Sequence, residues 1–350
     1  MTKFKRYDVA GLLGFTPIAR VPDAQIWSTI LTPNVRSFLG DIKSISGPHV
    51  METQKGLFPG DDVSNLNQHR LSGENDLVRF PYITTIVRTK NGALVIKRDA
   101  VKIKALAYIG DIDRGRGKLI FKGALRDRRF DGTRRANDTA LLDFPFDDSV
   151  NKPLPVGRGV ELSIYGYLPG SAITDIFPEE VEYENFVANP FTFLDRPQDF
   201  LRHFRRAWNG TRSPGQIAAA IPDVSQLIGE NFATIARKAG YDFIENAASH
   251  YHVAMWGQAI GYRFTYQKDA DNIAALTAGI KRLKDGGLKL TRTQESWVCV
   301  VQSLPSELIP NGLDLGGPKW PQNNIDQNNL WMNKPLTEKA AALLPGPIAR

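Results

Sequence analysis

The residues with the clearest chemical potential in this chain are a concentrated group of cations. Between Arg88 and Arg135 the sequence holds fifteen Lys or Arg against five Asp, whereas the whole chain has a formal net charge of only +7. A local excess of one sign indicates a polyanionic partner more directly than the overall isoelectric point does. We therefore expect phosphate groups of a nucleic acid to bind here. The candidate nucleic-acid-binding residues are Lys97, Arg98, Lys102, Lys104, Arg114, Arg116, Lys118, Arg126, Arg128 and Arg129.

An acidic segment follows the basic window and offers a second interpretation. Residues 143–200 contain eleven Asp or Glu against three Lys or Arg. These carboxylates could neutralise the basic window, either within one chain or between neighbouring subunits. Polyanion binding and charge pairing both stay open from the sequence alone.

Three glutamates in this segment have a spacing that could serve chemistry. Glu180, Glu182 and Glu184 alternate with two other residues, so in an extended strand their carboxylates would share one face. Crowded carboxylates can bind Ca²⁺ or Mg²⁺, or raise the pKa of one member for acid catalysis. No glycine-containing calcium loop accompanies them, so we interpret the three as an acidic interface.

Other reactive residue types lack a supporting pattern. His250 and His252 are two residues apart, and such residues do not share a helical face. Cys299 lies in an apolar run, where a thiol usually behaves as a small hydrophobe. The turn from Gly110 to Lys118 has the glycines and lysine of a phosphate loop, but Leu119 stands where a metal-binding hydroxyl is needed. We predict no metal, no cofactor and no catalytic residue, and keep His250 and the three glutamates for an alternative in which dispersed residues form an enzyme site.

The basic window reads as an antiparallel meander. Residues 82–88 are rich in β-branched side chains, and Asn91-Gly92 separates them from the apolar run 93–97, which is a strong hairpin signal. The run 101–106 alternates, with Lys102 and Lys104 on one face. Residues 118–122 and 160–168 are expected to be further strands. The sequence thus predicts a sheet whose solvent face is basic.

The second half of the chain reads as mainly helical. Helices are expected from Pro197 to Trp208, from 223 to 240, and from Asp242 to Trp256. A strand at 261–266, a helix at about 271–283 and a strand at Trp297–Val301 would then form a βαβ unit.

Both ends of the chain are rich in proline yet carry large apolar side chains. We divide the sequence into an irregular arm (1–76), a basic and acidic β region (77–195), a helical region with the βαβ unit (196–303) and a Pro/Asn-rich arm (304–350). Anchors such as Trp320 and Trp331 must be buried on their own chain or on a neighbour. Three Phe-Pro fragments near acidic residues, at Phe58, Phe144 and Phe177, read as loops.

These features favour one class of function. The fold class is α+β, with an antiparallel meander layer, a helix-rich half and long irregular arms. A start without a secretory pattern, one cysteine and no long apolar run suggest a soluble cytoplasmic protein or one inside an assembled particle, with no membrane partner. We expect a non-enzymatic structural protein that forms homo-oligomers and contacts nucleic acid, as in a virion shell or a ribonucleoprotein backbone. A protein-interaction module that binds an acidic partner is the third alternative.

Overall fold

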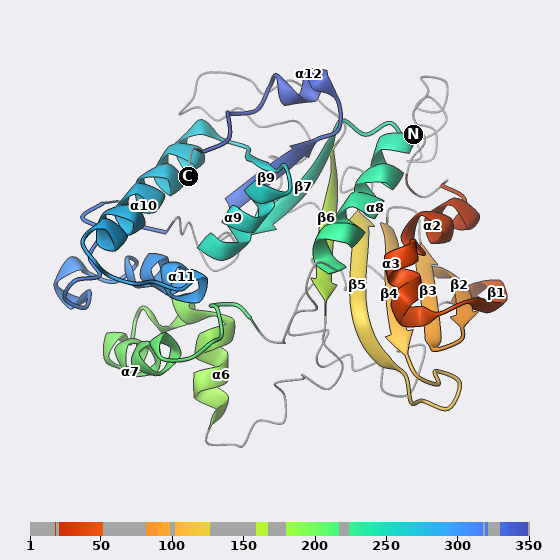
Figure 1. Cartoon of the computed structure of the whole chain (residues 1–350), viewed down its shortest axis with the longest axis horizontal. Coiled ribbons are helices and arrows are strands. Elements are labelled where there is room, and N and C mark those ends of the chain that lie inside the picture. Colours follow the sequence, from red (N-terminus) through yellow and green to blue (C-terminus); the bar gives the residue numbers. More distant parts are fainter. Residues whose placement is uncertain are drawn as a thin grey trace, which may run out of the picture.

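The fold is known from a computed structural model that describes residues 18, 21–51, 82–98, 102–126, 159–166, 180–216, 224–317, 319–320 and 330–348. Within these residues a nine-stranded sheet runs through the molecule in the order β1-β2-β3-β4-β5-β6-β7-β9-β8 (Figure 1). Every neighbouring pair is antiparallel except β6 and β7. The strands are β1 Ile42–Met51, β2 Tyr82–Thr89, β3 Gly92–Arg98, β4 Lys102–Ile109, β5 Lys118–Arg126, β6 Gly159–Gly166, β7 Phe243–Ala248, β8 Arg263–Phe264 and β9 Leu330–Pro335. The predicted α+β class is confirmed.

The helices cover the sheet in two groups. Helices α2, α3 and α8 lie over strands β2 to β6. In the second group α9, α10 and α12 contact β7, β9 and β8, α11 packs on α9 and α10, and α7 and α6 follow beyond α11 (Figure 1). The helices are α2 Asp23–Ile30, α3 Pro33–Leu39, α6 Val181–Ala188, α7 Pro197–Trp208, α8 Val224–Lys238, α9 Tyr251–Ala259, α10 Gln267–Asp285, α11 Arg292–Val301 and α12 Glu338–Ala341, with 3₁₀ turns η5 at Pro190–Phe193 and η6 at Ser306–Leu308. None of these described helices is long and apolar enough to cross a membrane.

The predicted meander is confirmed. Strands β2 and β3 pair in the register Arg88↔Ala93 around the Asn91-Gly92 turn, and β4 and β5 continue the antiparallel order. Glycine is required at 92, because a Cβ there would lie 1.9 Å from the carbonyl oxygen of Tyr108 on the neighbouring strand.

The N-terminal region is more regular than the sequence suggested. Residues 21–51 form α2, α3 and the edge strand β1, all packed on the meander. Prolines that read as interruptions in fact begin helices: Pro33 is at the start of α3, and Pro22 directly precedes α2. The fixed backbone angle of proline suits the first turn of a helix, where its missing N–H costs nothing.

The predicted βαβ unit at 261–301 is wrong, and the parallel strand pair of the sheet lies elsewhere. The expected strand at Trp297–Val301 is part of helix α11, which begins with a capping box between Thr291 and Gln294. Its apolar run is buried on all sides, and a continuous buried run does not separate helix from strand. The parallel pair is instead β6 and β7, joined through α6, α7 and α8.

The expected helix from Asp242 to Trp256 is also wrong in its first half. Phe243–Ala248 forms β7, an inner strand hydrogen-bonded to β6 and β9, and helix α9 begins only at Tyr251. An inner strand with neighbours on both sides gains its stability from tertiary pairing, which local propensity does not register.

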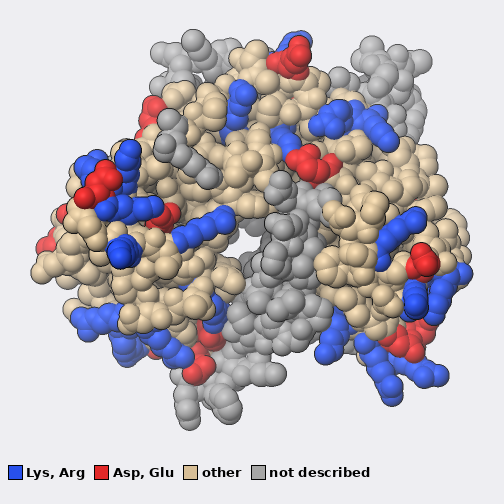
Figure 2. All heavy atoms as spheres, in the orientation of Figure 1, with Lys and Arg blue, Asp and Glu red and all other residues tan. Residues whose placement is uncertain are grey.

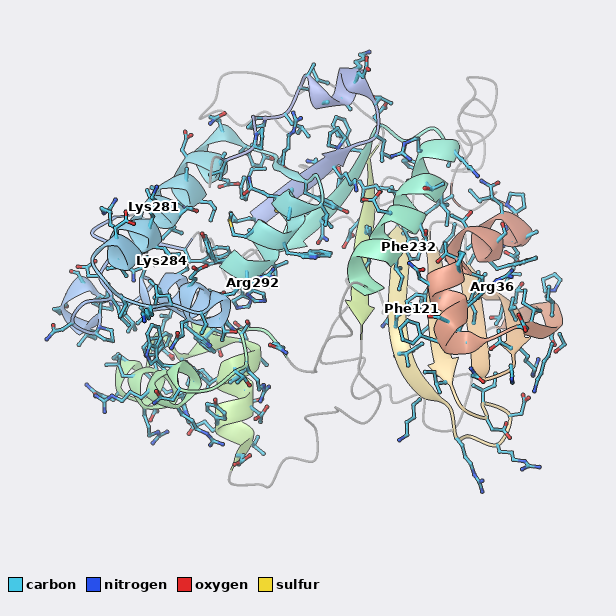
Figure 3. All side chains as sticks on the ribbon, viewed as in Figure 1. Arg36, Phe121, Phe232, Lys281, Lys284 and Arg292 are labelled. Atoms are coloured by element: carbon cyan, nitrogen blue, oxygen red, sulfur yellow. The ribbon has the colours of Figure 1, made fainter. Side chains whose placement is uncertain are left out.

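The main core fills the layer between the meander and its helices and continues into the helical half. Phe121 on β5 and Phe232 on α8 both point into this layer (Figure 3), and each is almost fully buried. The approach is close because β5 carries Gly123: a Cβ at that position would lie 2.3 Å from the Phe232 ring. Trp320, expected to anchor an arm, is buried in the same chain's main core, and Trp331 on β9 is partly buried.

Candidate polyanion-binding surface

Three chain segments meet at one end of the meander. They are the junction between α3 and β1, the β2–β3 turn and the β4–β5 turn. Backbone hydrogen bonds join them: the N–H of Lys90 donates to Asp41 O at 2.9 Å, and the N–H of Gly110 donates to Asn91 O at 2.7 Å. The side chains that these turns carry are therefore held on a rigid base.

The β4–β5 turn is ordered by its own sequence. The carboxylate of Asp111 accepts hydrogen bonds from the backbone N–H groups of Asp113 (3.1 Å) and Arg114 (3.2 Å). Gly110 and Gly115 supply the positive φ angles, 102° and 67°, that the reversal needs. These hydrogen bonds fix the backbone positions from which the exposed side chains of the turn project.

Arg88, at this end of the meander, is already paired with a carboxylate of the same chain. Arg88 binds Asp113 through two parallel hydrogen bonds of 2.9 and 2.7 Å, the geometry in which a guanidinium fits a carboxylate best. Its hydrogen bonds raise the pKa of Arg88 and lower the pKa of Asp113. Arg114 and Asp111 make a looser pair at 3.6 Å.

The other cations project into solvent. Lys43, Lys90, Arg116 and Lys118 are exposed, and none of them forms an ion pair with another described residue. Figure 2 shows Lys and Arg side chains projecting at the lower right, below the meander strands. We call Lys43, Lys90, Arg114, Arg116 and Lys118 the basic end.

The predicted basic face is not a solvent face. Lys104 and Arg126 are only 6% and 4% exposed, and Lys122, on the same strand as Arg126, is fully buried. Their strands alternate as expected, but this side of the sheet is covered. Arg98 is also occupied, with its Nε 3.0 Å from Asp23 and one guanidinium N–H donating to Val21 O. The expectation of a basic solvent face is therefore wrong at these positions.

Of the remaining predicted cations, Lys97 has a described side chain, and Lys102, Arg128 and Arg129 do not. Lys97 is half-buried opposite Lys104 in the β3–β4 register, and its side chain has interactions of its own. Lys102 is in β4, but its side chain lies outside the described residues, as do Arg128 and Arg129. Only Arg114, Arg116 and Lys118 of the predicted set belong to the basic end.

Sequence reasoning missed Lys43 and did not single out Lys90. Lys90 lies in the basic window and directly precedes the Asn91-Gly92 turn, and this position was a signal that could have identified it. Lys43 had no such signal, because its place beside Lys90 depends on β1 joining the sheet next to β2.

The three glutamates do not form a strand face. They lie at the start of helix α6, and each carboxylate contacts arginines of the same chain: Glu180 accepts from Arg206 at 2.9 Å, and Glu184 accepts from Arg212 at 2.7 Å. The prediction assumed the two-residue repeat of a strand, but this segment is helical, and residues two apart on a helix do not share one face. Arginines of the same chain thus pair with all three carboxylates, and the role of these residues as an acidic interface stays a prediction.

Glu182 is the most heavily paired of the three. It binds Arg196 at 3.1 Å, Arg202 at 2.9 Å and His203 at 3.3 Å. Desolvation works in the opposite direction, but these neighbours prevail and lower the pKa of Glu182. The carboxylate is thus ionised at neutral pH and is not suited to donate a proton.

The two histidines stack inside the helical half. His250 contacts the ring of Phe191 (5.5 Å between centroids) and that of His252 (6.0 Å), and its Nδ1 lies 2.9 Å from Ser249 Oγ. Burial lowers the pKa of both imidazoles, with a further charge effect from His252 on His250 and from Arg292 on His252, whose pKa falls to about 4.

The serine that contacts His252 is not an accessible nucleophile. Ser296 Oγ is 2.9 Å from His252 Nδ1, but Ser296 is completely buried, and a nucleophile must reach its substrate. Cys299 is buried on α11, which raises the pKa of its thiol. Among the described residues no group of three or more His, Cys, Asp or Glu side chains could hold a metal ion.

Comparison with known proteins does not assign the chain to a family. No protein-family model matches the chain, and neither curated proteins nor solved structures contain a chain with significant similarity to it.

Proposed function

We propose that this protein is a non-enzymatic assembly subunit, of virion-shell or ribonucleoprotein-backbone type, that contacts nucleic-acid phosphates through the basic end of its sheet. One observation carries the proposal. Exposed cations from three adjoining segments project from turns that backbone hydrogen bonds hold together, and four of them have no ion pair among the described residues. Contacts of this kind position a protein on a nucleic acid without reading its sequence.

The main competing explanation is charge pairing with the acidic segment. Glu180, Glu182 and Glu184 are already bound by arginines of α7 and the following loop, so these three are not available to neutralise the basic end. This favours a polyanion from outside the chain. Because Lys104, Lys122 and Arg126 are buried, the proposed phosphate contacts lie at the turns and not on the predicted sheet face.

Size-exclusion chromatography with light scattering, recorded at 260 and 280 nm in low and in 1 M salt, tests the proposal. We expect a species larger than one chain whose 260 nm absorbance falls in high salt, because phosphate contacts release counterions. Arg114→Glu, Arg116→Glu and Lys118→Glu together should remove the 260 nm absorbance.

A matched control makes the same change of charge elsewhere. Arg237, Lys281 and Lys289 are exposed and lie on α8, on α10 and after α10. Their replacement by Glu should leave the bound nucleic acid largely in place. A single chain free of nucleic acid at both salt concentrations would contradict the proposal, and a large species without 260 nm absorbance would favour an acidic protein partner.

A further inference from the structure

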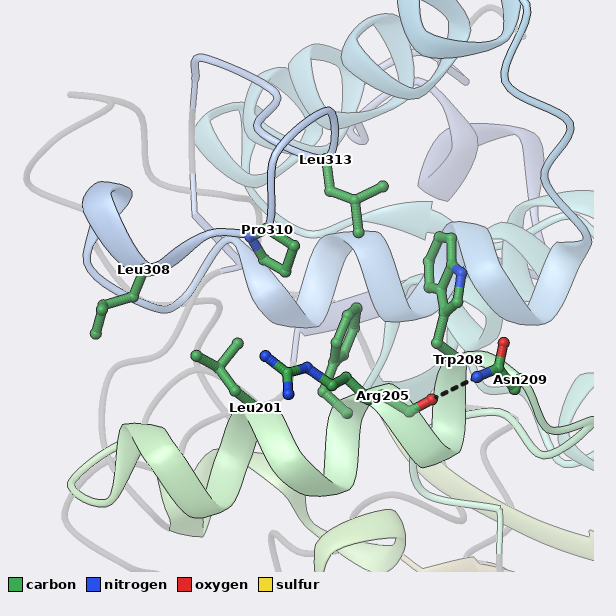
Figure 4. A pocket seen from close by; sticks show the side chains of 8 residues that line it. Leu201, Arg205, Trp208, Asn209, Leu308, Pro310 and Leu313 are labelled. Carbon is green, nitrogen blue, oxygen red and sulfur yellow. Dashed lines mark hydrogen bonds between the residues drawn. The ribbon is translucent and has the colours of Figure 1, made fainter.

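A cavity lies between helix α7 and the loop that follows η6. Its volume is 330 Å³, and its walls are mainly apolar, from Leu201, Phe204, Trp208, Leu308, Pro310 and Leu313 (Figure 4). This volume is at the lower end of the range for ligand clefts. Such a cavity fits one or two large side chains better than a nucleotide or an extended cofactor.

One cation at this cavity, Arg205, has no ion pair among the residues that the structure describes. Helix α7 carries three arginines, and Arg202 and Arg206 bind Glu182 and Glu180 at 2.9 Å. Arg205 is exposed, lines the cavity, and forms no ion pair with any residue that the structure describes. Figure 4 shows its guanidinium beside Leu201, toward the Leu308 and Pro310 side of the opening.

The apolar lining of the cavity and the positive charge of Arg205 together indicate which kind of segment can bind there. Apolar walls take aromatic or aliphatic side chains, and a guanidinium at the rim takes a carboxylate. A segment with aromatic residues directly followed by acidic residues satisfies both. The chain itself contains such a segment at 144–148, Phe-Pro-Phe-Asp-Asp.

We propose that the cavity beside Arg205 binds the Phe144–Asp148 segment of a second copy of this chain. The inference rests on the proposed assembly function and names one of its contacts. Because the cavity and the segment are different surfaces, the contact is heterologous, and repetition of it generates rings or filaments rather than a closed dimer.

The other two Phe-Pro fragments fit less well. Phe177-Pro178 offers a single aromatic ring before Glu179 and Glu180, and the carboxylate of Glu180 is already bound to Arg206 of its own chain. Phe58-Pro59 offers a single aromatic residue, with Gly60 between it and the first aspartate. The segment at 144–148 has two aromatic rings and two carboxylates in five residues.

A complementation experiment tests the contact between copies. Arg205→Glu removes the receptor charge, and Phe144→Ala with Phe146→Ala removes the donor rings. In 1 M salt, which minimises nucleic-acid contacts, we expect each variant alone to have the mass of one chain at concentrations where the wild type forms larger species. An equimolar mixture should form a two-chain species, since one intact receptor then meets one intact donor.

The control is Arg237→Glu, which reverses another exposed arginine and should assemble like the wild type. Wild-type assembly by Arg205→Glu, or a wild type of one-chain mass, overturns the proposal. A mixture that stays at the mass of one chain also overturns it, since the segment would then not bridge two copies.

A peptide identifies the occupant directly. A fluorescent peptide of residues 142–149 should bind the Phe144→Ala/Phe146→Ala protein, whose own segment does not compete. Binding should weaken at least tenfold when Arg205→Glu is added, and should vanish when both phenylalanines of the peptide are replaced. Equal binding with and without Arg205 overturns the assignment of the cavity. The nucleic-acid absorbance of the Arg114, Arg116 and Lys118 variants is a separate readout, so failure of this contact is distinguishable from failure of the proposed function.

Discussion

The guanidinium of Arg98 and the carboxylate of Asp23 lie 3.0 Å apart and connect strand β3 to helix α2. The same carboxylate accepts a hydrogen bond from Thr85 on β2 at 2.5 Å. One aspartate in the N-terminal region thus holds two adjacent strands of the meander. Arg98 lies in the window whose charge suggested phosphate binding, but its charge has a structural partner inside the chain.

Arg98→Ala is therefore expected to reduce stability without reducing nucleic-acid binding. Both side chains are largely shielded from solvent. The substitution removes the ion pair and also the hydrogen bond from the Arg98 guanidinium to Val21 O, and a hydrogen bond of a charged group contributes about 1.5–3 kcal/mol. Urea unfolding should show a loss of this size. Arg116→Ala, at an exposed position, should show the reverse pattern, with unchanged stability and weaker binding. Weaker binding by a stably folded Arg98→Ala protein would contradict this assignment of roles.

Two glycines that pack against the same interface should respond in opposite directions. Gly123→Ala places a Cβ 2.3 Å from the Phe232 ring, and overpacking of this kind costs about 1–3 kcal/mol. Gly229→Ala on α8 meets only Ile164 at 3.4 Å and gains helix propensity, worth up to about 1 kcal/mol. Thermal or urea unfolding of the two variants measures the difference. Equal effects would show that α8 does not approach β5 as described.

The two buried histidines predict acid sensitivity. A depressed pKa in the folded state means that the unfolded chain binds more protons between the ordinary histidine value and the folded value, so stability falls as pH drops through that interval. For His252 the interval runs from 6.5 down to about 4. The loss from this residue approaches about 3 kcal/mol at its lower end.

Urea unfolding at pH 7, 6 and 5 measures this dependence in a range above the ordinary titration of carboxylates. His252→Gln keeps a polar partner for Ser296 but does not titrate, so its stability should fall less steeply over this range. An unchanged pH dependence in His252→Gln would indicate that His252 is solvated and titrates normally.

The ion pairs of α6 should differ in strength according to their exposure. Glu184 and Arg212 are 12% and 21% exposed, whereas Glu182 and its partner Arg202 are 44% and 60% exposed. Exposed pairs contribute about 0–1 kcal/mol. Glu184→Gln should thus destabilise the protein clearly more than Glu182→Gln, although Glu182 has more cationic neighbours. A larger effect at Glu182 would reverse this order and show that the number of partners outweighs burial.

The meander could be predicted because its signals are local. Asn91-Gly92 fixes a turn, and β-branched runs on both sides fix the strands. The strand β7 and the helix α11 were misassigned because their burial comes from distant partners: Phe243 packs beside β9, and Trp297 stacks on Phe186 with ring centroids 5.4 Å apart. Periodicity within a window does not record such contacts.

The candidate site could be predicted only in part, for a related reason. Charge counts found the basic window, but they do not distinguish Lys104, buried on the sheet, from Lys118, exposed at its end. The alternating pattern of the sequence placed Lys104 on the correct face of its strand. The pattern carries no information about whether that face is exposed or covered. The pairing of Glu184 with Arg212, twenty-eight residues away, also requires the folded chain.

The salt dependence of nucleic-acid binding gives the sharpest test of the basic end. Each phosphate neutralised by a cation adds about 0.9 to the slope of log K against log salt for double-stranded DNA, and about 0.7 for single strands. Arg116→Ala with Lys118→Ala should therefore reduce the slope by about 1.4–1.8 if both side chains contact phosphates. The pair Lys281→Ala and Lys289→Ala removes the same charge from the α10 region and should leave the slope unchanged. Equal reductions in both pairs would mean that binding responds to overall charge, and the turns at the end of the sheet would then have no special role.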